Sequence, residues 1–255
     1  MNPTRIGVVV FAIAFGGALL GMWLRARLPE HHLTDDSQGT IKLGIGLIAT
    51  ITALVLGLVT ASAKSSFDSV DNAVKETASH LLALDRTLAR YGPESGEIRK
   101  AMKQAVGERI DMIWPKDSSR PISLDPSIAG MEHRVEALVD AIRALKPHDD
   151  LQRSLQNRAV DLAEAVLQSR WLVLAGTEAS VPMPFLVVLL FWLAVTFTSY
   201  GMLAPRNGTV IAVLFVCALS IGGALFLVLE MDGPFDGLLR VSPDPLRFAY
   251  THIAR

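Results

Sequence analysis

The sequence predicts an all-α polytopic membrane protein with four transmembrane helices and a helical soluble insert between helices two and three. The chain of 255 residues is 51% apolar and only 19% charged, and its mean hydropathy is +0.38, a composition outside the norm for soluble domains. Four uncharged apolar stretches are each long enough for a helix to cross a hydrocarbon core about 30 Å thick. Between the second and third stretch, apolar residues recur every three or four positions, as in amphipathic helices.

The first transmembrane hairpin is expected in residues 1–64. Residues 6–24 carry no charge, and no small-x-small cleavage site follows them in WLRARLPE, so we expect a retained span and not a signal peptide. Residues 43–63 are also uncharged, and Lys42 and Lys64 at their ends can extend their ammonium groups to the membrane interface. These residues form the second span.

The second transmembrane hairpin is expected in residues 183–230. Its spans, residues 185–203 and 209–229, are uncharged and separated only by the turn-forming sequence APRNG, which predicts a tight antiparallel pair. Four spans place both termini and the insert, residues 65–182, on the same side of the membrane. Residues 231–255 form a C-terminal tail.

Basic residues near the spans favour a cytoplasmic location for the insert and both termini. The insert side carries Arg5, Lys64, Lys75, Arg170, Arg240 and Arg247, and the opposite side carries Arg25, Arg27, Lys42 and Arg206. This excess follows the positive-inside rule. The single cysteine excludes an intrachain disulfide, which agrees with a reducing compartment. We therefore expect a multi-pass protein of a cell inner membrane.

The insert is expected to be an antiparallel helical bundle whose first helix continues directly from the second span. Apolar residues keep a near-heptad spacing from Phe67 to Tyr91, and Gly92 with Pro93 then ends the helix. Three further helices are predicted, separated by proline-containing segments.

The motif content argues against enzyme chemistry. GxSxG, GxxxxGK[ST], HExxH and paired CxxC motifs are missing from the sequence, so we expect no enzyme, no metal site and no cofactor. The net charge of −1 and the lack of a Lys/Arg-rich block give no reason to expect a nucleic-acid partner. The four spans also lack Asp, Glu and His, which argues against proton-coupled transport and is compatible with a passive pore.

Small residues recur in three spans at the spacing used for close helix contacts. In the second span they repeat every four residues and form one continuous flat face. The residues are Ala49, Ala53, Gly57 and Ala61 in the second span, Gly17 and Gly21 in the first, and Ala218 and Gly222 in the fourth. Tight helix packing within one subunit explains all of them.

A second interpretation places the second span at a symmetry axis shared by several copies of the chain. Small and hydroxylated residues would line a narrow ion path, and a leucine at the edge of this face would form an apolar constriction that gates by dewetting. The candidates are Thr50, Ala53, Gly57 and Thr60 for the lining, and Leu54 or Leu56 for the constriction. Periodicity alone does not decide between packing and pore lining.

The connection between the first two spans contains LPEHHLTDDS, which also has two interpretations. Adjacent histidines point in different directions, so they do not readily share one metal ion. The proline favours an extended entry, and the aspartates or the serine can cap the following helix. If the second span lines a pore, the glutamate and histidines would instead form titratable rings at its mouth. The residues are Pro29, Glu30, His31, His32, Asp35 and Asp36.

The segment after the fourth span, EMDGPFDGLLRVSPDP, combines carboxylates with glycines and prolines. Carboxylate oxygens suit a hard cation such as calcium, although the spacing does not match an EF-hand. Closure of a membrane helix at the interface also explains this composition. The motif residues are Glu230, Asp232, Pro234, Phe235, Gly237 and Arg240.

Three sequence strings together resemble the bacterial bestrophin-like membrane family, a family of unknown function that is remotely similar to bestrophin channels. They are LPEHHL with the following DDS, KLGIGLIATITALVLGLVTASAKSSFD at 42–68, and PFDGLLRVSPDPL at 234–246. The resemblance implies an oligomeric ion channel with four spans, cytoplasmic termini and a second span that lines the pore. Neither the neck residues of bestrophins nor the calcium clamp of the animal proteins can be placed on this chain, so none is carried over.

The leading hypothesis is therefore a homo-oligomeric passive ion channel whose partners are the lipid bilayer, inorganic ions and further copies of itself. The alternative is a membrane-anchored scaffold or signalling protein whose helical insert binds protein partners. That alternative predicts a monomer or dimer with a packed four-span bundle and an exposed apolar face on the insert.

Overall fold

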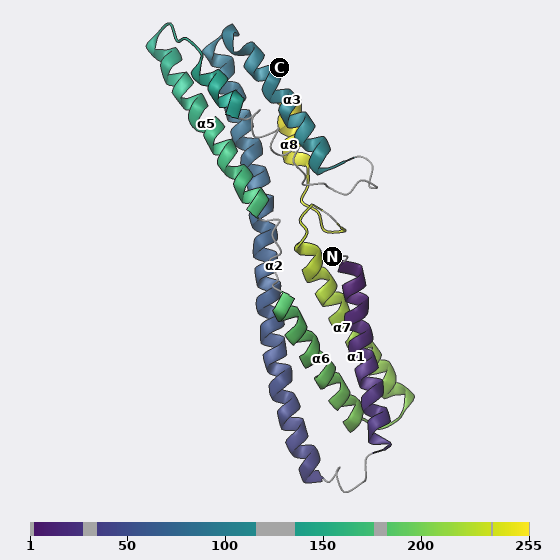
Figure 1. Ribbon diagram of the computed structural model, residues 1–255. Coiled ribbons are helices and arrows are strands. Elements are labelled where there is room, and N and C mark those ends of the chain that lie inside the picture. Colours follow the sequence, from purple (N-terminus) through teal and green to yellow (C-terminus); the bar gives the residue numbers. More distant parts are fainter. Residues whose placement is uncertain (1–2, 28–34, 116–135, 176–182, 236, 255) are drawn as a thin grey trace. The chain divides into compact units, whose positions relative to one another are not determined.

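The computed structural model of the chain describes residues 3–27, 35–115, 136–175, 183–235 and 237–254, and within these ranges it contains helices and no strand. The helices are α1 (Pro3–Arg25), α2 (Asp35–Tyr91), the short 3₁₀ helix η2 (Pro93–Ser95), α3 (Gly96–Ile113), α5 (Asp150–Ala175), α6 (Met183–Leu203), α7 (Gly208–Met231) and α8 (Asp244–His252) (Figure 1). Residues 136–143 are also helical. The predicted all-α class is confirmed for the described part of the chain.

Four of these helices, α1, α2, α6 and α7, are long and apolar enough to cross a membrane, which confirms the four predicted apolar helices. The predicted continuation of the second span is also observed, because α2 runs unbroken from Asp35 to Tyr91. It ends before Gly92, whose φ of +136° is a conformation that residues with a side chain rarely adopt.

The chain divides into two compact units. Met1–Ser66 and Ala179–Leu239 form the first, here called the membrane unit, and Phe67–Glu178 and Arg240–Arg255 form the second, here called the insert unit. Arg240–Arg255, the last part of the C-terminal tail, thus lies in the same unit as the insert.

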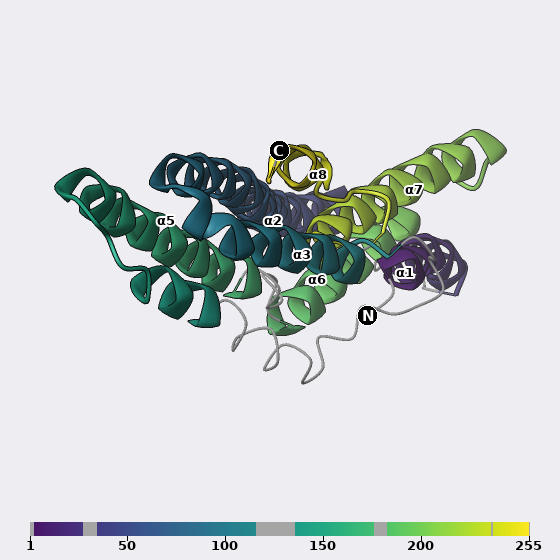
Figure 2. The same cartoon turned by 90° about the horizontal axis from the view of Figure 1, so that it is seen from above.

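Within the membrane unit, α1 packs along both α6 and α7 (Figures 1 and 2). Glycines permit the closest approach. A Cβ added to Gly21 of α1 would overlap the carbonyl oxygen of Thr198, and a Cβ added to Gly201 of α6 would overlap the carbonyl oxygen of Ala18. The two backbones therefore approach more closely than any residue with a side chain would permit at these positions.

The other small residues predicted on α1 and α7 also lie at helix contacts. A Cβ on Gly17 would lie 3.0 Å from the Thr198 hydroxyl oxygen, and one on Gly222 would lie 3.1 Å from the Gly7 carbonyl oxygen. Ala218 is fully buried in the hydrophobic core shared by α1, α6 and α7. These residues bring the helices of the membrane unit close together.

Arginines cap the adjacent ends of α1 and α6. Nη1 of Arg25 donates to the carbonyl oxygens of Leu203 and Ala204 at 3.0 and 2.7 Å. In the reverse direction, Nη2 of Arg206 donates to the carbonyl oxygen of Met22 at 2.7 Å. The cations satisfy terminal carbonyl groups and offset the negative end of each helix dipole.

In the insert unit, a buried serine closes the turn between α2 and α3. Ser95 is fully buried, and its hydroxyl oxygen lies 2.5 Å from the Leu88 carbonyl oxygen and 2.8 Å from that of Gly92. The side chain thereby satisfies carbonyl groups that the end of a helix leaves without a partner. Elsewhere in this unit α8 lies against α3 (Figures 1 and 2).

Candidate functional site

The face of α2 that the sequence nominates for pore lining is uncovered by the rest of the membrane unit. Leu54 is 74% exposed, and a Cβ added to Gly57 would meet no atom within 4 Å. Thr50, Ala53 and Ala61 are exposed as well. Because helix residues three or four positions apart lie on one side, these residues form a continuous open strip along α2.

The opposite face of α2 packs on the other helices of the membrane unit. Ile45, Thr52 and Ala63 are buried, and Leu56 contacts the core formed by α1, α6 and α7. The half-buried candidates are Ala49, Leu56 and Thr60. Of the two leucines considered for a constriction, Leu54 thus lies on the open strip and Leu56 lies towards the core.

Threonine hydroxyls on α2 are satisfied by their own helix. Oγ1 of Thr50 donates to the Gly46 carbonyl oxygen at 2.8 Å, and Oγ1 of Thr60 donates to the Leu56 carbonyl oxygen at 2.7 Å. Such bonds let a hydroxyl reside at membrane depth without another partner, because no donor is left unsatisfied. The hydroxyl oxygen of each keeps a lone pair free for another donor or for a cation.

The histidine-containing connection between α1 and α2 lies largely outside the described residues. This applies to Pro29, Glu30, His31 and His32, so the choice between a helix entry and a titratable ring remains a prediction for them. Asp35 and Asp36 lie in the first turn of α2.

The segment after the fourth span is organised around the carboxylate of Glu230. This side chain is only 4% exposed, and its Oε2 accepts hydrogen bonds from the backbone N–H groups of Leu238 at 2.6 Å and Leu239 at 3.4 Å. Gly237 has a φ of +81°, and a Cβ there would overlap Oε2 of Glu230. The glutamate therefore holds a tight turn that requires glycine.

The other residues of this motif that the structure describes differ in burial. Within the ranges that the structure describes, no group of three or more His, Cys, Asp or Glu side chains is arranged to hold a metal ion. Pro234 is buried, Phe235 and Asp232 are half-buried, and Arg240 is exposed. The Glu230 carboxylate accepts hydrogen bonds from its own chain, as helix closure predicts.

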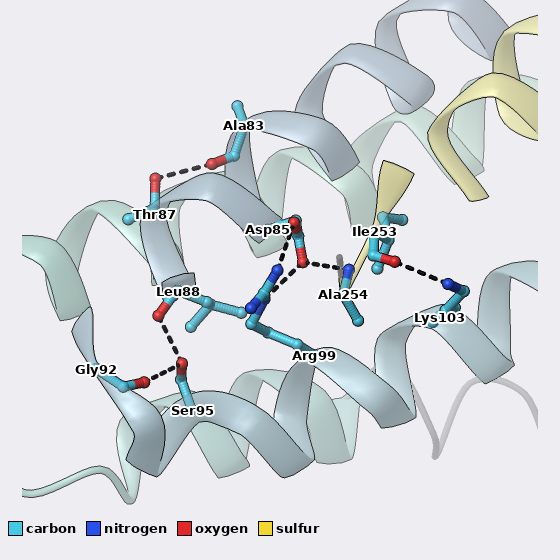
Figure 3. A network of polar contacts seen from close by, with 10 residues as sticks. All are labelled: Ala83, Asp85, Thr87, Leu88, Gly92, Ser95, Arg99, Lys103, Ile253 and Ala254. Atoms are coloured by element: carbon cyan, nitrogen blue, oxygen red, sulfur yellow. Dashed lines mark hydrogen bonds and ion pairs between the residues drawn. The ribbon is translucent and has the colours of Figure 1, made fainter. Parts of the chain in front are cut away.

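A polar network in the insert unit was missed by the sequence analysis (Figure 3). Asp85 of α2 is 5% exposed and accepts hydrogen bonds from Nε and Nη2 of Arg99 and from the backbone N–H of Ala254 at 3.1 Å. Nζ of Lys103 donates to the Ile253 carbonyl oxygen at 2.9 Å. These bonds fasten the residues after α8 to α2 and α3, and the bonds to Asp85 raise the pKa of the Arg99 guanidinium.

The insert unit also contains a cavity of about 600 Å³ bordered by α2, α3, α5, α8 and the helical residues 136–143. Its wall is mostly apolar, with contributions from Leu81, Ile98, Met102, Val106, Leu138 and Leu246. Glu97, Gln104 and Arg109 supply polar groups. A cavity of this size and lining can accept an apolar side chain or a small apolar ligand.

Comparison with known proteins relates the chain to a single family. A family model described as a Bestrophin-like domain matches residues 12–246. No curated protein sequence matches the chain significantly. The family match covers most of the chain, from within α1 to within α8, and includes the whole of α2, α6 and α7.

Solved structures with the same fold include those of a bacterial bestrophin homologue. A point mutant of a bacterial bestrophin homologue from Klebsiella pneumoniae has a TM-score of 0.69, 14% identity and 96% coverage of each chain. The homologue solved by Zn-SAD phasing has a TM-score of 0.66 and 14% identity over 97% of this chain and 96% of that one. A structure described as a membrane protein has a TM-score of 0.67 and 15% identity over 97% and 96%. At such identities the likeness shows the fold alone.

Proposed function

The chain belongs to the bestrophin-like family, and on this basis we propose that it is a homo-oligomeric passive ion channel of a bacterial inner membrane with α2 lining the pore. The main support is the open strip on α2. The apolar window of α2 is only 11% buried, whereas those of α1, α6 and α7 are 33%, 33% and 22% buried. Among the four apolar helices, α2 therefore has the largest surface available to another molecule.

The residue types on the open strip favour protein and ions over lipid as that other molecule. Gly57 and Ala61 offer lipid chains little apolar area but let a second helix or a hydrated ion approach closely. Thr50 adds a hydroxyl oxygen on the same side. We infer that copies of α2 surround an axis, with Thr50, Ala53, Gly57 and Thr60 toward the ion path.

Leu54 is the preferred candidate for an apolar constriction. It is largely exposed within the chain, whereas Leu56 contacts the core of the membrane unit. A ring of leucine side chains would hold back water and ions until the ring widened. The lack of charged residues along the predicted spans agrees with passive flow, because a coupled transporter needs titratable groups at membrane depth.

We further propose that both termini and the insert unit are cytoplasmic. The excess of basic residues near the spans on that side supports this orientation.

Two measurements test the proposed function. The mass of the detergent-solubilised protein should correspond to several chains, since a monomer has no axis to surround. Purified protein in liposomes should pass an anion or a cation above the level of empty vesicles under at least one of several pH and calcium conditions. Monomeric protein that passes no ion under any of them would rule the channel out.

A membrane-anchored scaffold is the second candidate, and the cavity in the insert unit favours it. The cavity has a volume of about 600 Å³ and a mostly apolar wall, so it can accept side chains of a protein partner. This function predicts a monomer or dimer without ion flux. The mass measurement therefore separates the two candidates before any partner is known.

A further inference from the structure

Two adjacent leucines are exposed directly after the fourth apolar helix. Leu238 is 81% exposed and Leu239 is 39% exposed. Their backbone N–H groups both point to the buried carboxylate of Glu230, which is the last but one residue of α7. The leucines therefore lie beside the end of α7, although the chain continues for several residues before it reaches them.

Their depth relative to a bilayer follows from this bond. The Leu238 nitrogen is 2.6 Å from Oε2 of Glu230, so it lies within one side-chain length of the end of the span. The headgroup region on each face of a bilayer is about 5–7 Å thick, given a core of about 30 Å in a total of about 40–45 Å. With the end of α7 at the edge of the hydrocarbon core, the backbone of the two leucines is expected within this region.

Specific interactions hold the turn that exposes the leucines. A carboxylate near the C-terminal end of a helix is disfavoured by the helix dipole, and the two amide hydrogen bonds to Glu230 offset this. Gly237 is required both by its φ of +81° and by the lack of space for a Cβ beside Oε2 of Glu230. The chain thus holds two large apolar side chains outwards instead of burying them.

We propose that Leu238 and Leu239 form a lipid anchor that inserts into the interface of the leaflet at the C-terminal end of α7. The membrane is the fitting partner because the leucines are exposed beside the end of an apolar helix whose own leucines are also exposed, Leu219 to 54% and Leu227 to 50%. Apolar side chains at the headgroup boundary gain burial without crossing the membrane. This anchor depends only on the chain being a membrane protein and holds whether or not the protein conducts ions.

A spin label at Leu238 tests the anchor in liposomes of phosphatidylcholine and phosphatidylglycerol. The label is attached to Leu238→Cys in a Cys217→Ser background, and its collisions with oxygen and with a water-soluble nickel complex report its depth. Leu219→Cys provides the lipid-facing reference. Leu151→Cys provides a solvent reference, since Leu151 is 68% exposed on α5 in the insert unit.

The ratio of oxygen to nickel accessibility at position 238 is expected to lie between the two references, at least twofold above that at position 151. A ratio equal to the solvent reference would overturn the anchor, as would shielding from both reagents, which indicates coverage by protein. In a second variant, Glu230→Ala, release of the turn should lower the ratio towards the solvent reference. An unchanged ratio there would overturn the role given to Glu230, and none of these readings depends on ion flux.

Discussion

The carboxylate of Asp85 accepts two hydrogen bonds from the guanidinium of Arg99, at 2.8 Å from Nε and 3.0 Å from Nη2. Only 7% of the Asp85 side chain and 18% of the Arg99 side chain are exposed. The net contribution of a buried ion pair to stability is small. Removing one partner is costly, because the remaining charge stays buried without water or a counter-charge.

Removal of the arginine from this pair should destabilise the insert unit strongly. Arg99→Met leaves the Asp85 carboxylate buried with one remaining backbone donor, Ala254, and the expected loss is about 3 kcal/mol of unfolding free energy. Arg153→Met is the matched control, since Arg153 and Asp150 form an exposed pair for which a change of about 0–1 kcal/mol is expected. Thermal unfolding of the full chain in detergent measures both, and equal losses would contradict the role of the buried pair.

A methyl group at the contact between α1 and α6 should separate the helices. Gly21→Ala places a Cβ on the carbonyl oxygen of Thr198, so the backbones must shift, and we expect a loss of about 2–3 kcal/mol. Gly16→Ala on the same helix meets nothing within 4 Å and should be neutral or slightly stabilising, because alanine favours helix. Melting temperatures in one detergent compare the two, and similar effects would contradict the close contact.

The four apolar helices and the length of α2 could be predicted because they depend on local sequence. Uncharged stretches specify spans, the heptad spacing past Lys64 specifies continuation, and Gly92 with Pro93 specifies the end. The close helix contacts within the membrane unit could be predicted from the sequence only in part. Gly17 and Gly21 follow a recognisable spacing, whereas Gly201 stands without such a pattern and became evident only from its approach to α1.

The candidate site was less predictable because its chemistry joins residues that are far apart in sequence. Periodicity made Leu54 and Leu56 equal candidates for the constriction. Only the packing of α2 in the membrane unit distinguishes them. Glu230 was recognised as part of a motif, but its partners, the amide groups of Leu238 and Leu239, carry no side-chain signal. The hydrogen bond between Asp85 and Ala254 joins residues from opposite ends of the insert unit's sequence, so no local sequence pattern indicates it.

The buried phenol of Tyr91 should make the insert unit sensitive to alkali. Tyr91 lies well beyond the apolar stretch of α2, its hydroxyl has no hydrogen-bond partner among the described residues, and burial raises its pKa, with added repulsion from Glu94 and Asp149. The folded state therefore resists deprotonation. The stability that the neutral phenol of Tyr91 contributes is fully present below the pKa of an unfolded tyrosine, about 10, and is lost as the pH rises above that value.

Tyr91→Phe should remove this loss of folding stability at alkaline pH. At pH 7 it should be neutral or stabilising by about 1 kcal/mol or less, because it deletes an unsatisfied hydroxyl. Tyr250→Phe is the control, since Tyr250 is 38% exposed and should keep the wild-type dependence. Melting temperatures between pH 8 and 11 test this, and a wild-type slope in Tyr91→Phe would contradict the assignment.

A large side chain at Gly57 should disturb assembly while leaving the single chain intact. A Cβ at Gly57 meets no atom of its own chain, so Gly57→Leu should fold, but it obstructs the strip proposed to face other copies. Gly223→Leu is the control, since Gly223 on α7 is also unobstructed but lies outside that strip. Mass in detergent is expected to fall for Gly57→Leu alone, and an unchanged mass would contradict a close approach of neighbouring copies of α2 at Gly57.

A polar residue in place of Leu54 should increase ion flux if this leucine forms the constriction. The leucine is 74% exposed within the chain, so Leu54→Ser removes little packing from the membrane unit. It replaces an apolar ring with hydroxyls that retain water, and a barrier lower by about 1.4 kcal/mol corresponds to about tenfold faster flow.

Liposome flux assays at equal protein content measure the effect of Leu54→Ser against Leu219→Ser. Leu219 is similarly exposed, at 54%, but lies on α7, away from the proposed axis. A faster flux in both variants would indicate general leakiness of the membrane unit, and no change in Leu54→Ser would move the constriction elsewhere on α2. Only a selective increase is expected, because the dewetting barrier depends on the side chains that surround the axis and not on apolar area facing lipid.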